Sequence, residues 1–325
     1  MPQRLPVILR VTTCVTAMSL LVAACNQPPV KATPTPRIRI ATGLPGMTFR
    51  SLGDALASAY GDVLTDMTFE VVETPGSVSN VQKLDMGEAE LGLALADVAY
   101  MGYNGHVAEL PRRATNVRAI SVLHPSTVHV LVGRRSAITS LSDLRGQRVG
   151  VGPGGSGTAV TSAILLRAYG VPASEVQQQA LPFLDAIDAL DRGRLDAVII
   201  TAADPVAVVR QATATGARLL DISGVPLERL RVAYPFLRPA TIPANTYAGQ
   251  IRPVQTVRED VLLMCRADLD EVVVHRLTTA LFQLLPQLVI ESDYLRLVDV
   301  RRAPATPIPL HPGAAWYYRE RELSR

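Results

Sequence analysis

Short apolar runs alternate with longer amphipathic stretches from residue 37 onward. Leu91–Leu95 has the length and composition of a buried strand, whereas Thr48–Tyr60 places its apolar residues on one helical face. This alternation predicts an α/β fold with largely parallel sheets. The predicted strands are 37–42, 68–72, 91–95, 148–151, 195–200, 217–222 and 261–266, with two more strand-like runs within 119–132, and the predicted helices are 48–60, 77–86, 158–169 and 272–290.

The body of the chain is long enough for two lobes, and a new βα unit begins near its middle. The last segment has no partner lobe of its own, so we expect it to return to the first. Lobe 1 is therefore predicted to comprise 37–131 and 239–325, and lobe 2 to comprise 132–238, with two strands crossing between them as a hinge. We expect Pro286 to kink or end its helix, and no internal repeat longer than one βα unit is apparent.

Residues 1–24 have the pattern of a secretory signal. Two arginines precede the apolar run Val11–Ala24, which is short for a membrane span of about 20 residues. The run ends in Leu-Val-Ala-Ala-Cys, which resembles the lipobox of bacterial lipoproteins. We therefore expect cleavage before Cys25 and acylation of that cysteine; the alternative is an ordinary signal cleaved after Ala24. The Pro-rich stretch 25–36 predicts an extended tether to the body.

Charge and cysteine content argue against nucleic-acid binding and against a disulfide-stabilised fold. Lys and Arg total 32 against 29 Asp and Glu, for a formal net charge of +3. No basic block with interleaved aromatic residues occurs, so we expect no nucleic-acid partner. Cys265 is the one cysteine beyond Cys25 and lies in an apolar run, which predicts a buried thiol.

The glycine-rich run Gly150–Thr158 follows a predicted strand and opens a predicted helix. Its glycines allow close approach of the backbone, and Ser156 or Thr158 can cap the helix. The free N–H groups of the first turn, beginning at Gly157, favour an anion such as a carboxylate or a phosphate. The alternative is a glycine-rich turn with a purely structural cap, because the run is neither a Walker loop nor a dinucleotide fingerprint.

Other polar turns follow the remaining strands. Thr42–Thr48 and Thr74–Ser77 each join a strand to a helix, Asp97 follows the strand at 91–95, and Asp204 lies at a strand end, where it could instead cap a helix. Because ligands bind at the carboxyl ends of strands in open α/β sheets, we expect these turns to face one cleft. The candidate ligand-binding residues are Thr42, Gly43, Gly46, Phe49, Ser77, Asp97, Ser156, Gly157, Thr158 and Asp204.

Several motifs together resemble the TAXI family of solute receptors for TRAP transporters. The resemblance runs from about residue 38 to the C-terminus and implies a type II periplasmic-binding-protein fold, whose two lobes close on a ligand. It also implies delivery of a small carboxylate, such as glutamate or a related organic acid, to TRAP permease subunits driven by an ion gradient. The residues that carry it are Gly76–Asn80, Gly87–Gly92, Asp97–Tyr100, Tyr103–Gly105, Val151–Thr158, Thr241–Ala244 and Pro307–Ala314.

Three positions depart from the TAXI pattern. The family's first turn usually carries an aromatic pair that ends in Tyr, whereas this chain has Phe49 and Arg50. The usual Ser before Asp97 is Ala96. Arg50 could hold a carboxylate, and the alternative is a solvent-facing residue in the first helical turn.

An enzyme is the rival class of function. No catalytic or metal-binding motif occurs around the five histidines or the body thiol, so we expect no enzymatic activity, cofactor or metal site. We expect a monomer in the periplasm that is lipid-anchored to the inner or the outer membrane. A ligand-binding module that feeds a sensor instead of a permease is the remaining alternative.

Overall fold

The computed structural model describes residues 36–291 and 293–323. The predicted signal peptide, Cys25 and the tether up to residue 35 lie outside the described residues. From Arg37 onward the chain forms one compact unit.

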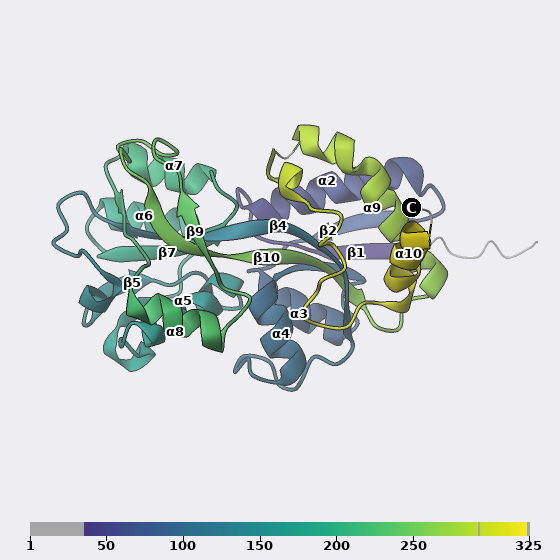
Figure 1. Cartoon of the computed structure of the whole chain (residues 1–325), viewed down its shortest axis with the longest axis horizontal. Coiled ribbons are helices and arrows are strands. Elements are labelled where there is room, and N and C mark those ends of the chain that lie inside the picture. The colour runs from purple at the N-terminus through teal and green to yellow at the C-terminus, as the bar shows by residue number, and fades with distance from the viewer. Residues whose placement is uncertain (1–35, 292, 324–325) are drawn as a thin grey trace, which may run out of the picture. The chain divides into compact units, whose positions relative to one another are not determined.

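Ten strands of this unit, within the described residues, form one mixed sheet (Figure 1). Its order is β2-β1-β3-β10-β4-β7-β5-β6, while β8 pairs with β4 and β9 with β10. The strands are β1 (Arg37–Ala41), β2 (Thr68–Val72), β3 (Leu91–Leu95), β4 (Val117–Val132), β5 (Arg148–Gly150), β6 (Gln177–Gln179), β7 (Ala197–Ala202), β8 (Arg218–Leu219), β9 (Arg238–Ile242) and β10 (Val254–Arg266). The helices are α2 (Thr48–Val63), α3 (Ser77–Asp85), α4 (Ala96–Asn104), α5 (Gly157–Ala168), α6 (Phe183–Asp191), α7 (Ala207–Ala214), α8 (Val225–Ala233), α9 (Glu271–Glu291) and α10 (Pro312–Leu323), with 3₁₀ turns η2 (Leu141–Leu144), η3 (Ala173–Glu175) and η4 (Asp293–Leu297).

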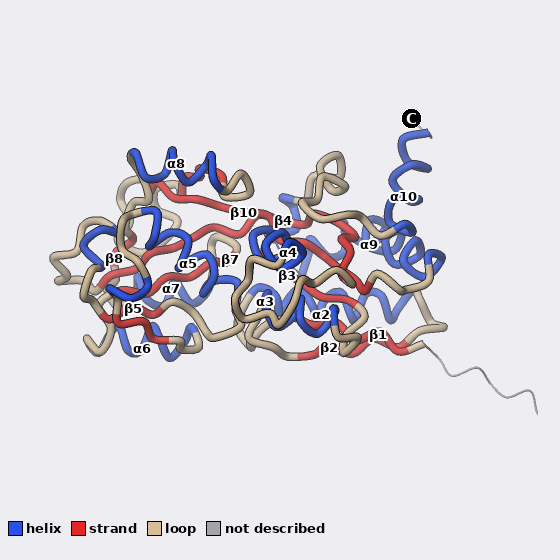
Figure 2. The backbone as a smooth tube through the Cα atoms, turned by 90° about the horizontal axis from the view of Figure 1, so that it is seen from below, coloured by secondary structure: helices blue, strands red, loops and turns tan. Residues whose placement is uncertain are grey.

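The sheet is parallel towards both ends and antiparallel in its middle. β1 pairs in parallel with β2 and β3, and β5 with β6 and β7. β4 and β10 pair antiparallel with each other and with their other neighbours. These two long strands run through both halves of the sheet (Figures 1 and 2). Two α/β lobes that share central strands confirm the predicted fold class.

Two predictions placed the central strands too narrowly. The two runs expected within 119–132 are one strand, which passes through Pro125 opposite Asp260, beside a β-bulge. The strand expected at 261–266 begins at Val254, because the charged stretch before it pairs with β4 and β9. The predicted lobe boundaries stay predictions.

Helices cover both faces of the sheet in each half (Figure 1). α2, α9 and α10 share a hydrophobic cluster with β1 and with the Leu91, Leu93 and Leu95 side chains of β3. On the other face, α3, α4, α5 and α8 share a second cluster with alternate residues of β4 and β10. α6 and α7 form a third cluster with β7. Strands that are buried on both faces, such as β3 and β7, appear in the sequence as continuous apolar runs, whereas the edge strands β2 and β6 are partly or fully exposed.

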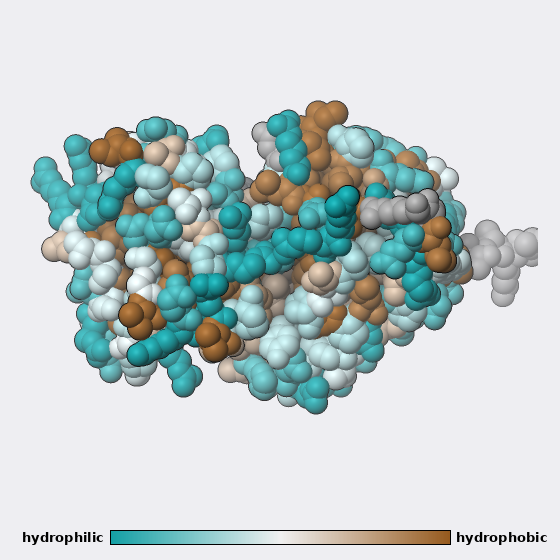
Figure 3. Space-filling model, viewed as in Figure 1, coloured by the Kyte–Doolittle hydropathy of each residue, from teal (hydrophilic) through white to brown (hydrophobic). Residues whose placement is uncertain are grey.

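Helix α9 is long and apolar enough, by length and composition alone, to cross a membrane. It continues past Pro286, which was expected to kink or end it. Val274 and Leu277 are fully buried and belong to the cluster shared with α2 and β1, so α9 is a core helix of this lobe. Ile290 is 83% exposed, and Figure 3 shows hydrophobic surface over this end of the helix.

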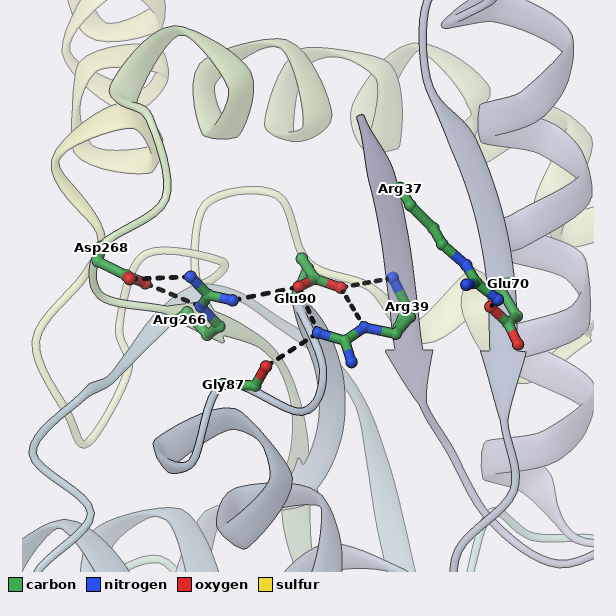
Figure 4. Close-up of polar contacts among 7 residues, drawn as sticks. All are labelled: Arg37, Arg39, Glu70, Gly87, Glu90, Arg266 and Asp268. Atoms are coloured by element: carbon green, nitrogen blue, oxygen red, sulfur yellow. Dashed lines mark hydrogen bonds and ion pairs between the residues drawn. The ribbon is translucent and has the colours of Figure 1, made fainter. Parts of the chain in front are cut away.

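The two lobes repeat one structural unit that was not apparent from the sequence. In the first, Arg39 of β1 binds Glu90 through its backbone N–H and guanidinium and also donates to the Gly87 carbonyl (Figure 4). In the second, Arg148 of β5 binds Asp196 and the Gly193 carbonyl in the same way. Both glycines have positive φ. Each unit fixes a strand against the helix-to-strand turn at the edge of the sheet opposite the glycine-rich turns that follow β1 and β5.

Candidate functional site

A cleft lies at the carboxyl ends of the strands, between the two lobes. The turn after β1, the N-termini of α3, α5 and α6, and residues of β4 and β7 enclose it. Its cavity volume is about 40 Å³, which is room for roughly three water molecules at about 10–15 Å³ each. The lining residues are Gly43, Leu44, Met47, Thr48, Phe49, Pro75, Gly76, Ser77, Leu95, Ser126, Ser156, Gly157, Thr158, Phe183, Thr201 and Ala202.

Six of the ten predicted ligand-binding residues line this cleft: Gly43, Phe49, Ser77, Ser156, Gly157 and Thr158. Ser156 caps α5, since its Oγ accepts the Ala159 N–H at 3.2 Å. The Ser77 Oγ accepts the Leu95 N–H at 3.1 Å. These hydroxyls hold the first turns of α5 and α3 towards the cleft.

The other four predicted residues lie outside the lining. The Thr42 hydroxyl donates to the Val72 carbonyl, and Gly46 forms the tip of a turn with φ of 77°. Asp204 accepts the Thr127 hydroxyl at 2.6 Å. Asp97 is fully buried. The Thr42 and Asp97 side chains are directed into the protein, Asp204 is half-buried, and Gly46 has no side chain. β3 ends at Leu95 as predicted, whereas β7 extends to Ala202, beyond its predicted end at residue 200.

Sequence reasoning missed two hydroxyls of the cleft. Ser126 on β4 and Thr201 on β7 both line it and are 1% and 8% exposed. Their Oγ atoms have no hydrogen-bond partner among the described residues. Because buried hydroxyls are nearly always paired, these two are candidates for contact with a ligand. The sequence marks these two residues in one way: each is a polar residue on a largely apolar strand.

No charged side chain is among the cleft-lining residues of the described chain. Arg50 pairs instead with Asp54 at 2.9 Å and Glu73 at 3.3 Å, which supports its solvent-facing interpretation. Positive potential in the cleft therefore comes from the N-termini of α3 and α5, whose first N–H groups lack intrahelical acceptors.

The two lobes touch each other beside the cleft. The Ser79 N–H of α3 donates to the Gly155 carbonyl of the glycine-rich turn at 3.1 Å. A Cβ on Gly155 would lie 2.5 Å from the Ser79 Oγ. Gly155 also has a φ of 80°, so glycine is required both by its backbone and by this close approach. The structure is thus a closed arrangement of the lobes.

A larger hollow of about 660 Å³ lies between α4 and the segment after α8. Tyr100 and Phe236 line it, and so does Arg238, which pairs with Asp260. We place the ligand site in the smaller cleft, because the glycine-rich turns, both helix N-termini and the unpartnered hydroxyls meet there.

The fold is that of the two-lobed periplasmic binding proteins. The chain belongs to the NMT1-like family, whose profile matches residues 40–321. It is similar to a protein of Xanthomonas citri solved with bound chloride, with 12% identity, coverage of 88% of this chain and 99% of that chain, and a TM-score of 0.52. It is also similar to a histidine kinase sensor domain that resembles periplasmic binding proteins. The two share 15% identity over 82% of this chain and 98% of that chain, with a TM-score of 0.50. The substrate-binding protein of an amino acid ABC transporter aligns with 17% identity over 80% of this chain and 96% of that chain, at a TM-score of 0.49.

Proposed function

We propose that this protein is an extracytoplasmic solute receptor of the TAXI type, which captures a small carboxylate and delivers it to a TRAP permease. One observation carries the proposal. The N-termini of α3 and α5 and two hydroxyls that have no partner among the described residues converge on a cleft, and no charged side chain of the described chain lines it. Helix N-termini bind anions through free N–H groups and the helix dipole. Ser126 and Thr201 can each add a hydrogen bond.

The lining favours an acid without an amino group. The ammonium group of glutamate would need an anionic or carbonyl partner, and no carboxylate is among the lining residues of the described chain. Phe49 and Phe183 offer apolar surface to a carbon body. A small monocarboxylate or oxo acid therefore fits this cleft better than an amino acid.

A thermal-shift screen of the purified protein tests this proposal with matched pairs of small acids, such as pyruvate against alanine. A ligand at 100 times its Kd adds about 2.7 kcal/mol to the stability of the folded form, which raises the Tm by about 5 °C for a domain of this size. We expect the oxo acid of a pair to raise the Tm more than its amino acid. The carboxylate assignment fails if no small acid raises the Tm.

The expected location is the periplasm, with an acyl anchor on Cys25. Mass spectrometry of the N-terminal peptide from membranes distinguishes an acylated cysteine from an ordinary cut after Ala24.

A sensor module is the second candidate function, and similarity to the sensor domain of a histidine kinase favours it. The genes beside this one separate the two functions. A neighbouring TRAP permease gene supports transport, whereas a neighbouring kinase gene without a permease supports sensing.

A further inference from the structure

Two buried carboxylic acids lie where the lobes meet, behind the cleft. Asp97 is in the first turn of α4. Glu259 is on β10, between the segment that pairs with β9 (254–258) and the segment that pairs with β3 (261–265). Both side chains are 0% exposed. Thr161 reaches the acids from α5, so these contacts join elements of both halves of the sheet.

Hydrogen-bond geometry indicates that the pair holds a proton. The Thr161 Oγ1 lies 2.8 Å from the Asp97 Oδ2 and 3.1 Å from the Glu259 Oε1. A hydroxyl has one proton to donate, and Thr161 also lies within 3.1 Å of the Gly157 carbonyl. It cannot donate to both acids, so one acid must donate to the hydroxyl. The Glu259 Oε2 accepts the Asp97 N–H at 3.1 Å and the Asp97 Oδ1 accepts the Val98 N–H, so the shared proton lies on the Glu259 Oε1 or on the Asp97 Oδ2.

Among the described residues, no cation forms an ion pair or a hydrogen bond with either acid. The other charged or titratable side chains on the elements around the pair are Arg258, Asp260, Cys265 and Arg266 on β10, Arg118, His124 and His129 on β4, Arg238 on β9, Arg167 on α5, Glu228, Arg229 and Arg231 on α8, Lys83 and Asp85 on α3, and Tyr100 and Tyr103 on α4. Burial raises the pKa of Asp97 to about 6, and hydrogen bonds with Thr161, with Glu259 and with the Val98 N–H limit that rise. Burial and then the charge of Asp97 raise the pKa of Glu259 well above its usual range.

We propose that Asp97, Thr161 and Glu259 form an interlobe latch that holds one proton while the lobes are closed, so that closure takes up a proton. This inference rests on the proposed function only in that the lobes open and close. Opening separates Thr161 from the acids and admits water, which stabilises the ionised carboxylates. The closed form is therefore favoured at low pH and loses stability as the pH rises through the closed-state pKa values.

Small-angle scattering of the purified protein without added acid tests the latch across about pH 5 to about pH 9. We expect the radius of gyration to increase with pH, since each pH unit between the open-state and closed-state pKa values changes the open-to-closed ratio by up to about tenfold. Glu259→Gln keeps the shape of the side chain but cannot ionise, so its radius should stay constant. Glu90→Gln is the matched control, because Glu90 is also buried but pairs with Arg39 and Arg266. A wild-type pH profile in Glu259→Gln, or a flat profile in Glu90→Gln, overturns the proposal.

Infrared spectroscopy gives a second test that does not depend on the folding of Glu259→Gln. We expect the wild-type protein at neutral pH to show the carbonyl stretch of a protonated carboxylic acid. Thr161→Ser should retain the band, and Thr161→Val should weaken it, since valine cannot accept the proton. Absence of the band in the wild type overturns the latch. If the band and the pH-dependent radius are present but no carboxylate raises the Tm, the latch stands and the proposed ligand class fails.

Discussion

At Gly157, one added methyl group should weaken ligand binding without lowering the stability of the fold. Gly157 is the first residue of α5 and lines the cleft. A Cβ at this position would lie 2.6 Å from the Leu95 Cδ1 and 2.6 Å from the Ser77 Oγ, where ordinary contact begins at 3.4 Å. Both neighbours belong to the lobe opposite α5. The overlap of Gly157→Ala therefore exists in the closed arrangement and is relieved when the lobes open.

The size of the effect follows from packing energetics. Forcing an extra methyl group into a filled site costs about 1–3 kcal/mol. This cost falls on the closed form alone, and an affinity changes tenfold for about 1.4 kcal/mol. The Kd for the acid identified by the thermal screen should therefore rise by about 5-fold to 150-fold. The Tm without ligand should stay constant or rise slightly, because alanine is favoured over glycine in helices by up to about 1 kcal/mol.

Titration calorimetry and scattering with saturating acid measure these two effects. Gly154→Ala is the control in the same turn, because a Cβ there meets nothing within 4 Å. It should bind and close as the wild type does. The reasoning is refuted if Gly157→Ala binds with wild-type affinity and reaches the wild-type radius, or if the two substitutions weaken binding equally.

Two further predictions concern the hydroxyls of the cleft and the Arg39 unit. Ser126→Ala and Thr201→Val remove hydroxyls that have no hydrogen-bond partner within residues 36–291 and 293–323. The Tm should therefore hold or rise while the affinity falls by about fivefold, the value of a neutral hydrogen bond near 1 kcal/mol; a lower Tm with unchanged affinity would contradict this. Arg39→Gln removes the bidentate partner of Glu90 and should cost about 2–3 kcal/mol of unfolding free energy. Arg39 lowers the pKa of Glu90, so this stabilisation should be present above the usual Glu pKa and vanish as the pH falls through the lowered value. Urea unfolding at several pH values measures it, and an equal loss at all pH values would count against the pair.

Several strands could be predicted from the sequence, but the edge strand β6 and the full length of the central strands β4 and β10 could not. β2 and β3 have the predicted bounds. β3 is buried on both faces and is therefore a continuous apolar run, whereas β2 is an edge strand without a buried position. β4 contains Pro125, which lacks the N–H of a ladder residue and separates two apolar runs. β10 begins with a stretch that includes Arg258, Glu259 and Asp260, which is typical of a loop until the partner strands are known.

The candidate site was predictable at the level of the backbone. Glycine-rich turns and capping residues such as Ser156 are local signals, and they do meet in one cleft. The direction of a side chain depends on long-range partners, which local patterns do not contain. Asp97 follows a strand as a ligand-binding acid would, but its partners are Thr161 and Glu259, far along the chain. Ser126 lies in a strand-like run and has no local motif.

The buried acids and the neutral cleft are physically connected. The Thr161 hydroxyl contacts the Gly157 carbonyl at 3.1 Å, so the acid pair lies one helical turn behind the proposed anion site. Two ionised carboxylates there would oppose a bound anion, since charges interact strongly in a low-dielectric interior. A proton on the pair removes one of these charges. Binding of the ligand and binding of the proton are thermodynamically linked. If the proton on the Asp97–Glu259 pair raises the affinity for the ligand by some factor, the bound ligand raises the proton affinity of the pair by the same factor. Calorimetry in two buffers of different ionisation enthalpy should therefore detect proton uptake on binding in the wild type and none in Glu259→Gln.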